Sequence, residues 1–217
     1  EEIIMKILFF GDSLTDGGRD RSGEAYPSLQ MGTGFPLLIN ARLGRDYPEK
    51  KFQFVNRGVN GNRLSELYAR IEPDVVLERP DVISLMAGIN DCGFYSLWGL
   101  QVDADRFGRL YETMIDELHG FLPNASFLIC EPIFYPAGWR KDNKEGIREL
   151  LPPIQQAAKR TAEKKGIPFL PLQEKFEALC KAQEPEYWLF DGIHPTPAGH
   201  QVIADAWIEL FQKEYLQ

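Results

Sequence analysis

The sequence has few cysteines and no long apolar run. Its 217 residues include only 3 cysteines, Cys92, Cys130 and Cys180, and such an odd, widely spaced set does not form a disulfide framework. Sparse cysteine use favours a reducing compartment. No stretch approaches the roughly 18 apolar residues of a membrane span, and the acidic N-terminal stretch shows no small-residue cleavage site of a signal peptide. We therefore expect a cytoplasmic protein without a membrane-inserted part.

Basic residues are also scarce relative to acidic ones. The chain has 24 Lys and Arg against 32 Asp and Glu, a net charge of −8, which disfavours nucleic acid and anionic membranes as partners because both require a basic face. The 3 histidines and 3 cysteines are too scattered to give the spacing of metal ligands, so we expect no metal and no cofactor. With 44% apolar and 26% charged residues the composition is that of a globular protein. We expect one domain that spans residues 1–217.

Short apolar runs alternate with amphipathic segments along the chain. Apolar residues recur at helical spacing in 103–122 and 197–213. Five apolar runs predict buried β-strands, at 3–10, 52–56, 81–87, 126–132 and 167–172. Strands that alternate with helices predict βαβ units, and therefore a parallel sheet covered by helices on both faces.

Three long connections follow predicted strands, at 14–33, 90–102 and 132–144. In an open α/β sheet, ligands bind at the carboxyl ends of the strands. Long connections in a compact domain are either functional or disordered, and the aromatic content of these three disfavours disorder. We therefore expect them to surround the functional site.

The small number of histidines limits the choice of a general base. His119 falls near the end of a predicted helix, off its apolar stripe, where a solvated histidine is favoured. His200 falls in the first turn of the last predicted helix, where a hydrogen-bonding role is favoured. His194 precedes a proline on a rigid loop, three residues after Asp191. A carboxylate at this spacing can fix the tautomer of the imidazole, although for this pair alone the plainer interpretation is two loop residues that never meet.

Serine, glycine and asparagine follow the first three predicted strands. The stretch "FFGDSLTD" ends a strand in a turn that carries Ser13 between two aspartates. "VNRGVNG" places Gly58 after the second strand, and "MAGIND" places Asn90 after the third. A glycine N–H and an asparagine amide can donate to a developing oxyanion, although a turn glycine and a capping asparagine are each the plainer interpretation in isolation. Together with the Asp/His pair, these residues would gather at one edge of the sheet.

As a set, these stretches resemble the SGNH, or GDSL, hydrolase family. "FFGDSLTD", "VNRGVNG", "GIND" and "DGIHP" match the four family blocks in order, and the matches extend over nearly the whole chain. The resemblance implies Ser13 as nucleophile, Asp191 and His194 as the rest of a catalytic triad, and an oxyanion hole made by the N–H groups of Ser13 and Gly58 with the Asn90 side chain. It also implies an α/β fold, a three-layer α/β/α sandwich with a five-stranded parallel sheet in the flavodoxin-like order.

Within this family, "GTGF", "VNRGVNGNRLSELYAR" and "AGHQVIADAW" are most similar to bacterial intracellular esterases that remove acetyl groups from xylo-oligosaccharides. The resemblance implies a small-molecule ester substrate and removal of short acyl groups from carbohydrate esters through an acyl-enzyme. Aromatic side chains near the expected site could stack on sugar rings or merely pack the loops. They are Tyr95, Trp98, Tyr135, Trp139 and Trp188, and for the last of them packing against the triad loop is favoured.

Other functions stay open at this point. A lysophospholipase or thioesterase would need an apolar channel beside Ser13, and the charged, glycine-rich 14–33 connection disfavours one. A non-catalytic carbohydrate-binding protein on the same scaffold is disfavoured by the four intact blocks, and a phosphoryl-transfer enzyme by the lack of a G-x-x-x-x-G-K-[ST] loop. The aromatic C-terminal helix, with Trp207, Phe211 and Tyr215, could pack inside the domain or join subunits of a homo-oligomer.

Overall fold

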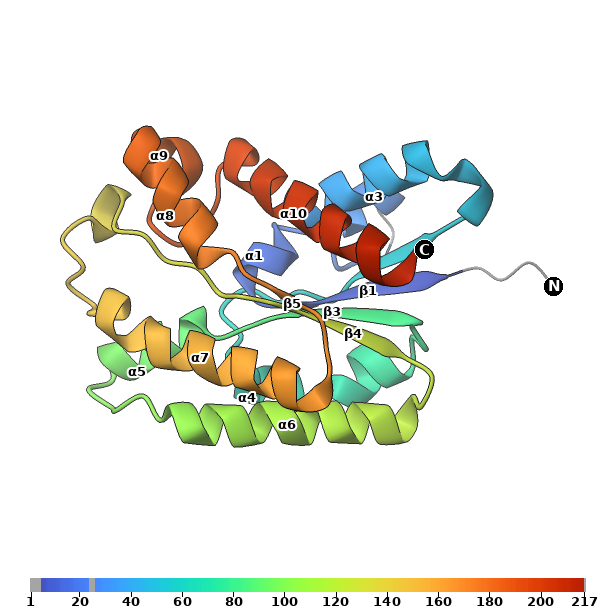
Figure 1. Ribbon diagram of the computed structural model, residues 1–217, viewed down its shortest axis with the longest axis horizontal. Helices are drawn as coiled ribbons and strands as arrows, with labels where there is room; N and C mark the ends of the chain where they lie inside the picture. Colours follow the sequence, from blue (N-terminus) through green and yellow to red (C-terminus); the bar gives the residue numbers. More distant parts are fainter. Residues whose placement is uncertain (1–4, 24–25, 217) are drawn as a thin grey trace.

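A parallel sheet forms the centre of the computed structural model, which describes residues 5–23 and 26–216. Its strands are β1 (Lys6–Gly11), β2 (Gln53–Asn56), β3 (Val82–Met86), β4 (Ser126–Cys130) and β5 (Phe169–Leu170). They lie in the order β2-β1-β3-β4-β5, and every neighbouring pair is parallel (Figure 1). The five predicted strands and the flavodoxin-like order are therefore confirmed. Residues 3 and 4 of the first predicted strand lie outside the described residues.

Helices cover both faces of this sheet, so the three-layer architecture is confirmed. Figure 1 shows α3 (Phe35–Asp46), α8 (Gln173–Ala182) and α10 (Pro197–Tyr215) on one face, and α4 (Leu64–Tyr68), α6 (Ala104–Phe121) and α7 (Ile147–Lys165) on the other. The shorter helical elements are α1 (Ser13–Asp16), α2 (Pro27–Gln30), η1 (Pro48–Lys50), η2 (Glu72–Val76), α5 (Ile89–Leu97), η3 (Gly138–Arg140) and α9 (Pro185–Trp188).

The strand register brings the ends of three strands to one place. Gly11 at the end of β1 pairs with Met86 at the end of β3, which in turn pairs with Cys130 at the end of β4. Because all strands are parallel, the segments that follow these residues leave the sheet at the same edge. The turn after β1, helix α5 after β3 and the connection after β4 are therefore neighbours.

The last helix is fixed to the middle of the sheet. Pro197 is its first residue, and the Thr196 hydroxyl caps it by accepting the Gly199 N–H at 3.3 Å. The Trp207 side chain is fully buried, and its indole N–H donates to the Ser84 hydroxyl of β3 at 2.9 Å. Phe211 is fully buried as well. The aromatic face of α10 thus packs inside the chain, where burial of such large side chains contributes strongly to stability.

The prediction of an open connection over 90–102 is wrong for most of its length, since α5 occupies Ile89–Leu97. Ile89 and Cys92 lie one helical turn apart and are both buried. The Asp91 carboxylate is also buried and accepts the Leu64 N–H at 3.1 Å, which ties α5 to the start of α4. This tertiary contact favours a helix in a stretch whose own periodicity is weak.

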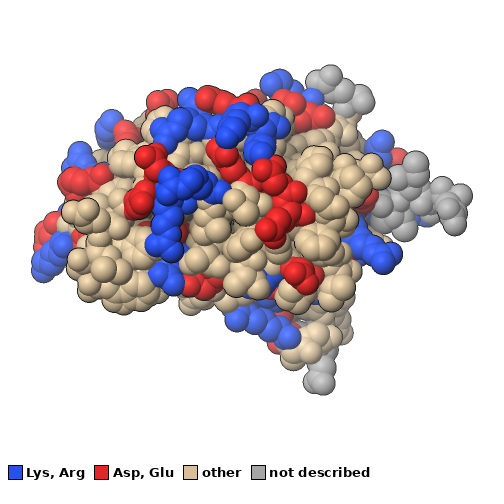
Figure 2. Space-filling view, turned by 90° about the horizontal axis from the view of Figure 1, so that it is seen from below, with Lys and Arg blue, Asp and Glu red and all other residues tan. Residues whose placement is uncertain are grey.

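Figure 2 shows the face of α4, α6 and α7, on which basic and acidic side chains alternate. Helices α6 and α7 are joined there by the ion pairs Lys164–Glu112 at 2.6 Å and Lys165–Asp116 at 2.5 Å. Among the described residues, no helix is both long enough and apolar enough to cross a membrane. Nor does the described part of the chain contain a group of three or more His, Cys, Asp and Glu side chains placed to hold a metal ion.

Candidate active site

Three of the predicted site residues come together in one hydrogen-bonded line. Ser13 is the first residue of α1, directly after β1, and its Oγ lies 2.8 Å from Nε2 of His194. Nδ1 of His194 lies 2.8 Å from Oδ2 of Asp191. A nucleophile within hydrogen-bond reach of a base, which is itself oriented by a third group, is the arrangement required for nucleophilic catalysis.

A tight local turn brings Asp191 to His194. Oδ1 of Asp191 accepts the backbone N–H groups of Ile193 at 2.9 Å and His194 at 2.7 Å. Aspartate favours such turns because its short side chain can bond to the backbone two and three residues ahead. Leu189 and Pro195 pair as a short antiparallel bridge, which closes the base of the turn. The D-x-x-H spacing therefore orients the imidazole through local contacts.

The aspartates around Ser13 differ in their ionisation. Burial raises the pKa of the Asp191 carboxyl, but hydrogen bonds from the His194 ring and from the His194 and Ile193 N–H groups outweigh it and lower the pKa to about 2. Burial instead raises the pKa of Asp12 to about 7 and that of Asp91 to about 7. Asp12 accepts the Leu14 N–H at 3.0 Å, so it caps α1. Asp191 is thus the ionised acid of the site, and Asp12 and Asp91 support turns.

The other two histidines have structural contacts. Nδ1 of His200 accepts the Phe35 N–H at 3.2 Å. Burial, together with the nearby His194, lowers the pKa of His200 to about 4, so it stays neutral. The His119 ring stacks on Phe127, with the ring centroids 5.8 Å apart. His194 is therefore the histidine placed to act on Ser13.

Gly58 does not offer a free donor in this structure. Its N–H donates to Oδ1 of Asn56 at 2.8 Å. A Cβ at Gly58 would lie 2.3 Å from the Asp16 backbone nitrogen, so glycine is required for the close approach of this segment to α1. The expectation that the Gly58 N–H points at an oxyanion is thus corrected, because Asn56 already accepts it.

Asn90 lies beside a neighbouring glycine that the sequence interpretation passed over. Nδ2 of Asn90 donates to the Asn62 carbonyl at 3.0 Å, and its second amide hydrogen has no partner among the described residues. Gly61, with φ of +79°, directly precedes Asn62, and within the described part of the chain its N–H has no acceptor. In the sequence, the second glycine of "VNRGVNG" was the signal for this backbone donor. This turn therefore brings a free backbone donor close to the Asn90 amide.

A cavity of about 620 Å³ opens above the three aligned residues. Its lining includes Trp139, which was among the five aromatic candidates, and Phe190, which was not. The Phe190 ring stacks on the His194 ring at 5.7 Å, and Trp139 meets Phe190 edge-on at 5.7 Å. Phe190 directly precedes Asp191, so its place beside the "DGIHP" block was a signal in the sequence. The Arg21 guanidinium also reaches the cavity, paired with Asp16.

The other aromatic candidates are placed elsewhere. Tyr95 and Trp98 flank the Arg63 guanidinium, which lies 5.7 Å and 4.9 Å from their ring centroids. The Trp188 indole N–H donates to the Leu179 carbonyl at 3.2 Å, and the ring packs against the core. These contacts favour packing roles for the three residues.

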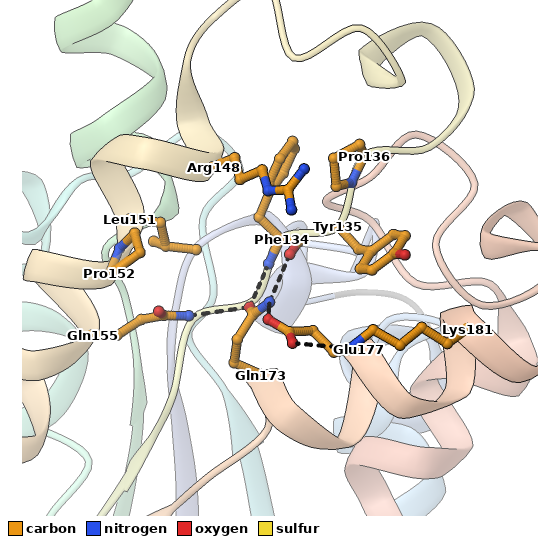
Figure 3. A pocket seen from close by; sticks show the side chains of 10 residues that line it. All are labelled: Phe134, Tyr135, Pro136, Arg148, Leu151, Pro152, Gln155, Gln173, Glu177 and Lys181. Atoms are coloured by element: carbon orange, nitrogen blue, oxygen red, sulfur yellow. Dashed lines mark hydrogen bonds and ion pairs between the residues drawn. The ribbon is translucent and has the colours of Figure 1, made fainter.

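Tyr135 lines a second cavity, of about 500 Å³, which is shown in Figure 3. In Figure 3 the side chains of Gln155 and Gln173 point toward one another across its floor, 3.1 Å apart. Gln173 also bonds to the N–H of Phe134 at 3.0 Å and to its carbonyl at 2.9 Å. The Tyr135 N–H donates to the Gly192 carbonyl at 3.0 Å. The glutamines therefore fix Phe134, whose neighbour Tyr135 contacts the turn at Asp191.

Arg140 is a further residue that the sequence interpretation missed. Its guanidinium Nη1 lies 2.7 Å from Oδ2 of Asp191, which is the oxygen that also bonds to His194. The two residues are 51 positions apart in the chain. No local pattern could have paired them, because the contact depends on how the connection after β4 folds back over the turn at Asp191.

Comparisons with known proteins give a consistent result. Residues 9–202 match the model of the GDSL-like Lipase/Acylhydrolase family. An acetylxylan esterase of Geobacillus stearothermophilus is 30% identical over 220 residues, which cover 98% of this chain and 96% of that protein. A solved structure of an acetylxylan esterase from this species superposes with a TM-score of 0.82 at 30% identity, covering 97% and 96% of the two chains.

A putative GDSL-like lipase from Parabacteroides merdae superposes with a TM-score of 0.89 at 29% identity, over 95% of this chain and 94% of the other. LAE5, an alpha/beta hydrolase enzyme from the metagenome of Lake Arreo, gives a TM-score of 0.83 at 28% identity, over 96% of each chain. Because the family model matches most of this chain and the parallel sheet has the expected order, the chain belongs to the GDSL-like lipase/acylhydrolase family and is a carboxylic ester hydrolase.

Proposed function

We propose that the protein hydrolyses esters of short acyl groups through an acyl-enzyme on Ser13. The observation that carries this proposal is the line from Ser13 through His194 to Asp191, with both contacts at 2.8 Å. His194 accepts the Ser13 proton as Oγ attacks the ester carbonyl, and the ionised Asp191 stabilises the imidazolium that forms. His194 then protonates the departing alcohol. Water attacks the acyl-enzyme in the same way, which releases the acid and restores Ser13.

The developing oxyanion needs hydrogen-bond donors on the opposite side of the carbonyl from His194. We assign this role to the N–H groups of Ser13 and Gly61 and to the Asn90 amide. The contact of Asn90 with the Asn62 carbonyl supports the assignment, because it keeps the amide beside the turn that carries the free Gly61 N–H. Backbone and amide donors of this kind stabilise the transition state without reorganising during the reaction.

Asn90→Ala is expected to lower kcat about 10²–10³-fold with little change in KM, since an oxyanion donor acts mainly in the transition state. Steady-state kinetics on an acetate ester measure both constants. Asn124→Ala is the matched control, because Asn124 is an exposed asparagine before β4, at the far edge of the sheet. A crystal structure of the Ser13 phosphonate adduct should place the phosphoryl oxygen about 3 Å from the Gly61 nitrogen. An oxygen bonded to the Gly58 nitrogen would reject the assignment of Gly61.

We further propose that the substrate is an acetylated carbohydrate. The acetylxylan esterase relative supports this proposal, since it is similar over nearly the full length of both chains. Two solved structures of that esterase carry an alanine in place of a serine and of an aspartate, and both are described as catalytic mutants. In this chain, the exposed Trp139 ring and the Phe190 ring beside His194 offer apolar surfaces on which a sugar ring can stack.

Hydrolysis of p-nitrophenyl esters of increasing chain length tests the acyl preference. We expect kcat/KM for the acetate to exceed that for the octanoate about tenfold or more, because a short-acyl pocket excludes additional methylenes. Acetylated xylo-oligosaccharide should then release acetate, with the unacetylated oligosaccharide as a competitive inhibitor. A preference for octanoate would instead support the lysophospholipase or thioesterase function. If neither ester turned over, the short-acyl mechanism proposed for Ser13 would be rejected, and carbohydrate binding without turnover of such esters would be the function to test next.

A further inference from the structure

We propose that Arg140 is a positioning residue of the catalytic base, which holds the Asp191 carboxylate against His194 and partly offsets the charge of that carboxylate. The inference rests on the proposed function, since it assigns Arg140 to the base of that reaction. The inference is carried by three contacts of Asp191: with the backbone of its own turn, with the imidazole of His194, and with the connection that follows β4.

The Asp191 carboxylate has its hydrogen-bonding capacity filled. Oδ1 accepts two backbone N–H groups, at 2.9 Å from Ile193 and 2.7 Å from His194. Oδ2 accepts Nδ1 of His194 at 2.8 Å and Nη1 of Arg140 at 2.7 Å. The side chain of Asp191 is 1% exposed and that of Arg140 is 20% exposed, so solvent screens the pair weakly. With four donors on two oxygens, the carboxylate has one orientation, and Arg140 supplies the only cation among those donors.

Arg140 is itself held in place by its neighbours. It ends the short helical turn η3, where its N–H donates to the Ala137 carbonyl at 2.9 Å. The Nε atom makes no hydrogen bond among the described residues but lies 3.7 Å from Oε1 of Glu145, and the guanidinium carbon lies 5.4 Å from the centroid of the Trp139 ring. A planar guanidinium fixed in this way orients the carboxylate that it meets, which a flexible ammonium would do less well.

The connection that carries Arg140 lies directly on the turn of Asp191. Gly138 has φ of +51°, and a Cβ there would lie 2.3 Å from the Phe190 carbonyl oxygen. Only glycine combines this conformation with so close an approach. The Gly138 N–H donates to Oε1 of Glu186 at 2.9 Å, and the Trp139 ring packs edge-on against Phe190. The backbone contact, the hydrogen bond and the ring contact all hold η3 where Arg140 reaches Asp191.

Several charged groups lie around His194 and the Asp191–Arg140 pair. Asp191 favours the imidazolium, and Arg140 opposes it from the far side of the same carboxylate. His200 is neutral, since its pKa is lowered to about 4 by burial and the nearby His194, and Asp12, whose pKa burial raises to about 7, is only partly ionised at neutral pH. The remaining charged groups that line the cavity or lie beside Arg140 are Asp16, Arg19, Arg21, Lys141, Glu145 and Glu186. Unlike the cations of this set, Arg140 bonds directly to Asp191.

Arg140→Met and Arg140→Lys separate charge from packing. In Arg140→Met the imidazolium loses an opposing charge, so the acidic limb of the kcat/KM profile should move up by about one pH unit. Its kcat should fall about 10–100-fold, because the carboxylate is less well held. Arg140→Lys keeps the charge, so its acidic limb should stay at the wild-type pH while kcat falls at least about threefold. Guanidinium ion at millimolar concentration should partly restore kcat in Arg140→Ala, whereas the same concentration of sodium chloride should not.

The matched control is Arg148→Met, since Arg148 is an exposed arginine on the first turn of α7 that has no contact with Asp191 among the described residues. It should reproduce the wild-type profile. If Arg140→Met keeps the wild-type acidic limb, or moves it to lower pH, the inference is overturned. Should Arg140→Met fail to fold, Arg140→Lys decides: a wild-type kcat overturns the inference, and a lowered kcat at an unchanged limb supports it. Ser13→Ala, measured in parallel, reports on the serine mechanism independently of either result.

Discussion

Ser13→Ala is expected to lower kcat for an acetate ester about 10⁴–10⁶-fold, because what remains is only the catalysis by the oxyanion donors and substrate binding. Oγ of Ser13 lies 2.8 Å from Nε2 of His194, and a methyl group can neither give up a proton nor attack a carbonyl. The side chain makes no other hydrogen bond among the described residues, so the variant should fold normally. Initial rates at saturating substrate, together with the thermal midpoint, measure both effects.

Labelling with a fluorophosphonate supplies the control for this expectation. Wild type should gain one adduct, which peptide mass spectrometry should locate on Ser13, and Ser13→Ala should gain none. Ser28→Ala is a matched variant, because Ser28 lies exposed on α2 and is not among the residues that line the cavity at His194. The serine mechanism is rejected if Ser13→Ala hydrolyses the ester at the wild-type rate, or if the adduct forms on another residue.

The second large effect is expected for Asp191→Asn, which should lower kcat about 10⁴-fold, as replacing the triad acid by its amide does elsewhere. An amide in place of Oδ2 would turn N–H donors toward Nδ1 of His194 and the Arg140 guanidinium, both of which are donors themselves. The imidazole would then adopt the tautomer with its proton on Nε2. In that tautomer it cannot accept the Ser13 proton, so the loss falls on kcat.

The same substitution also leaves a partly buried cation without the carboxylate of Asp191. Asp191→Asn should therefore lower the thermal midpoint, because Arg140 keeps its charge in a weakly solvated place. The double variant Asp191→Asn/Arg140→Met should recover part of the midpoint but none of the activity, which a double-mutant cycle can measure. A kcat within about tenfold of wild type for Asp191→Asn would show that Asp191 is not the triad acid.

The sheet and the turn at Asp191 were predictable because their signals are local. Each strand is a short apolar run between turn residues, and alternation with helices implies parallel pairing. Likewise, an aspartate three residues before a histidine can bond to the intervening backbone without help from distant segments. Both features follow from residues close together in the chain.

The choice between Gly58 and Gly61 was beyond the sequence. Both glycines lie in the same short stretch after β2, and either could offer a backbone N–H. What separates them is the Asn56 side chain, which accepts the Gly58 N–H, and the approach of α1 to within 2.3 Å of where a Gly58 Cβ would lie. The Asn56 amide in turn donates to the Thr15 carbonyl, so its position, like the approach of α1, depends on the packing of two segments that are about 40 residues apart.

Tertiary contacts also decided where the aromatic side chains lie. Composition predicted loops rich in aromatic residues, but the direction of each ring depends on its neighbours. Trp139 reaches the cavity because η3 rests on the turn at Asp191, whereas Trp98 packs over Arg63 directly after α5, a helix that the sequence did not predict. The Arg140–Asp191 pair was hidden for the same reason.

The indole of Trp207 bonds to Ser84 in the central sheet, while the other end of α10 continues from the turn that carries His194. Ser13, by contrast, extends from β1 of the sheet itself. The proposed nucleophile and its proposed base thus belong to different layers of the sandwich, and the distance between them depends on how the helix layer packs on the strands. Under the proposed mechanism, catalytic alignment therefore depends on core packing, and so on apolar residues such as Trp207 and Phe211 that do not line the cavity.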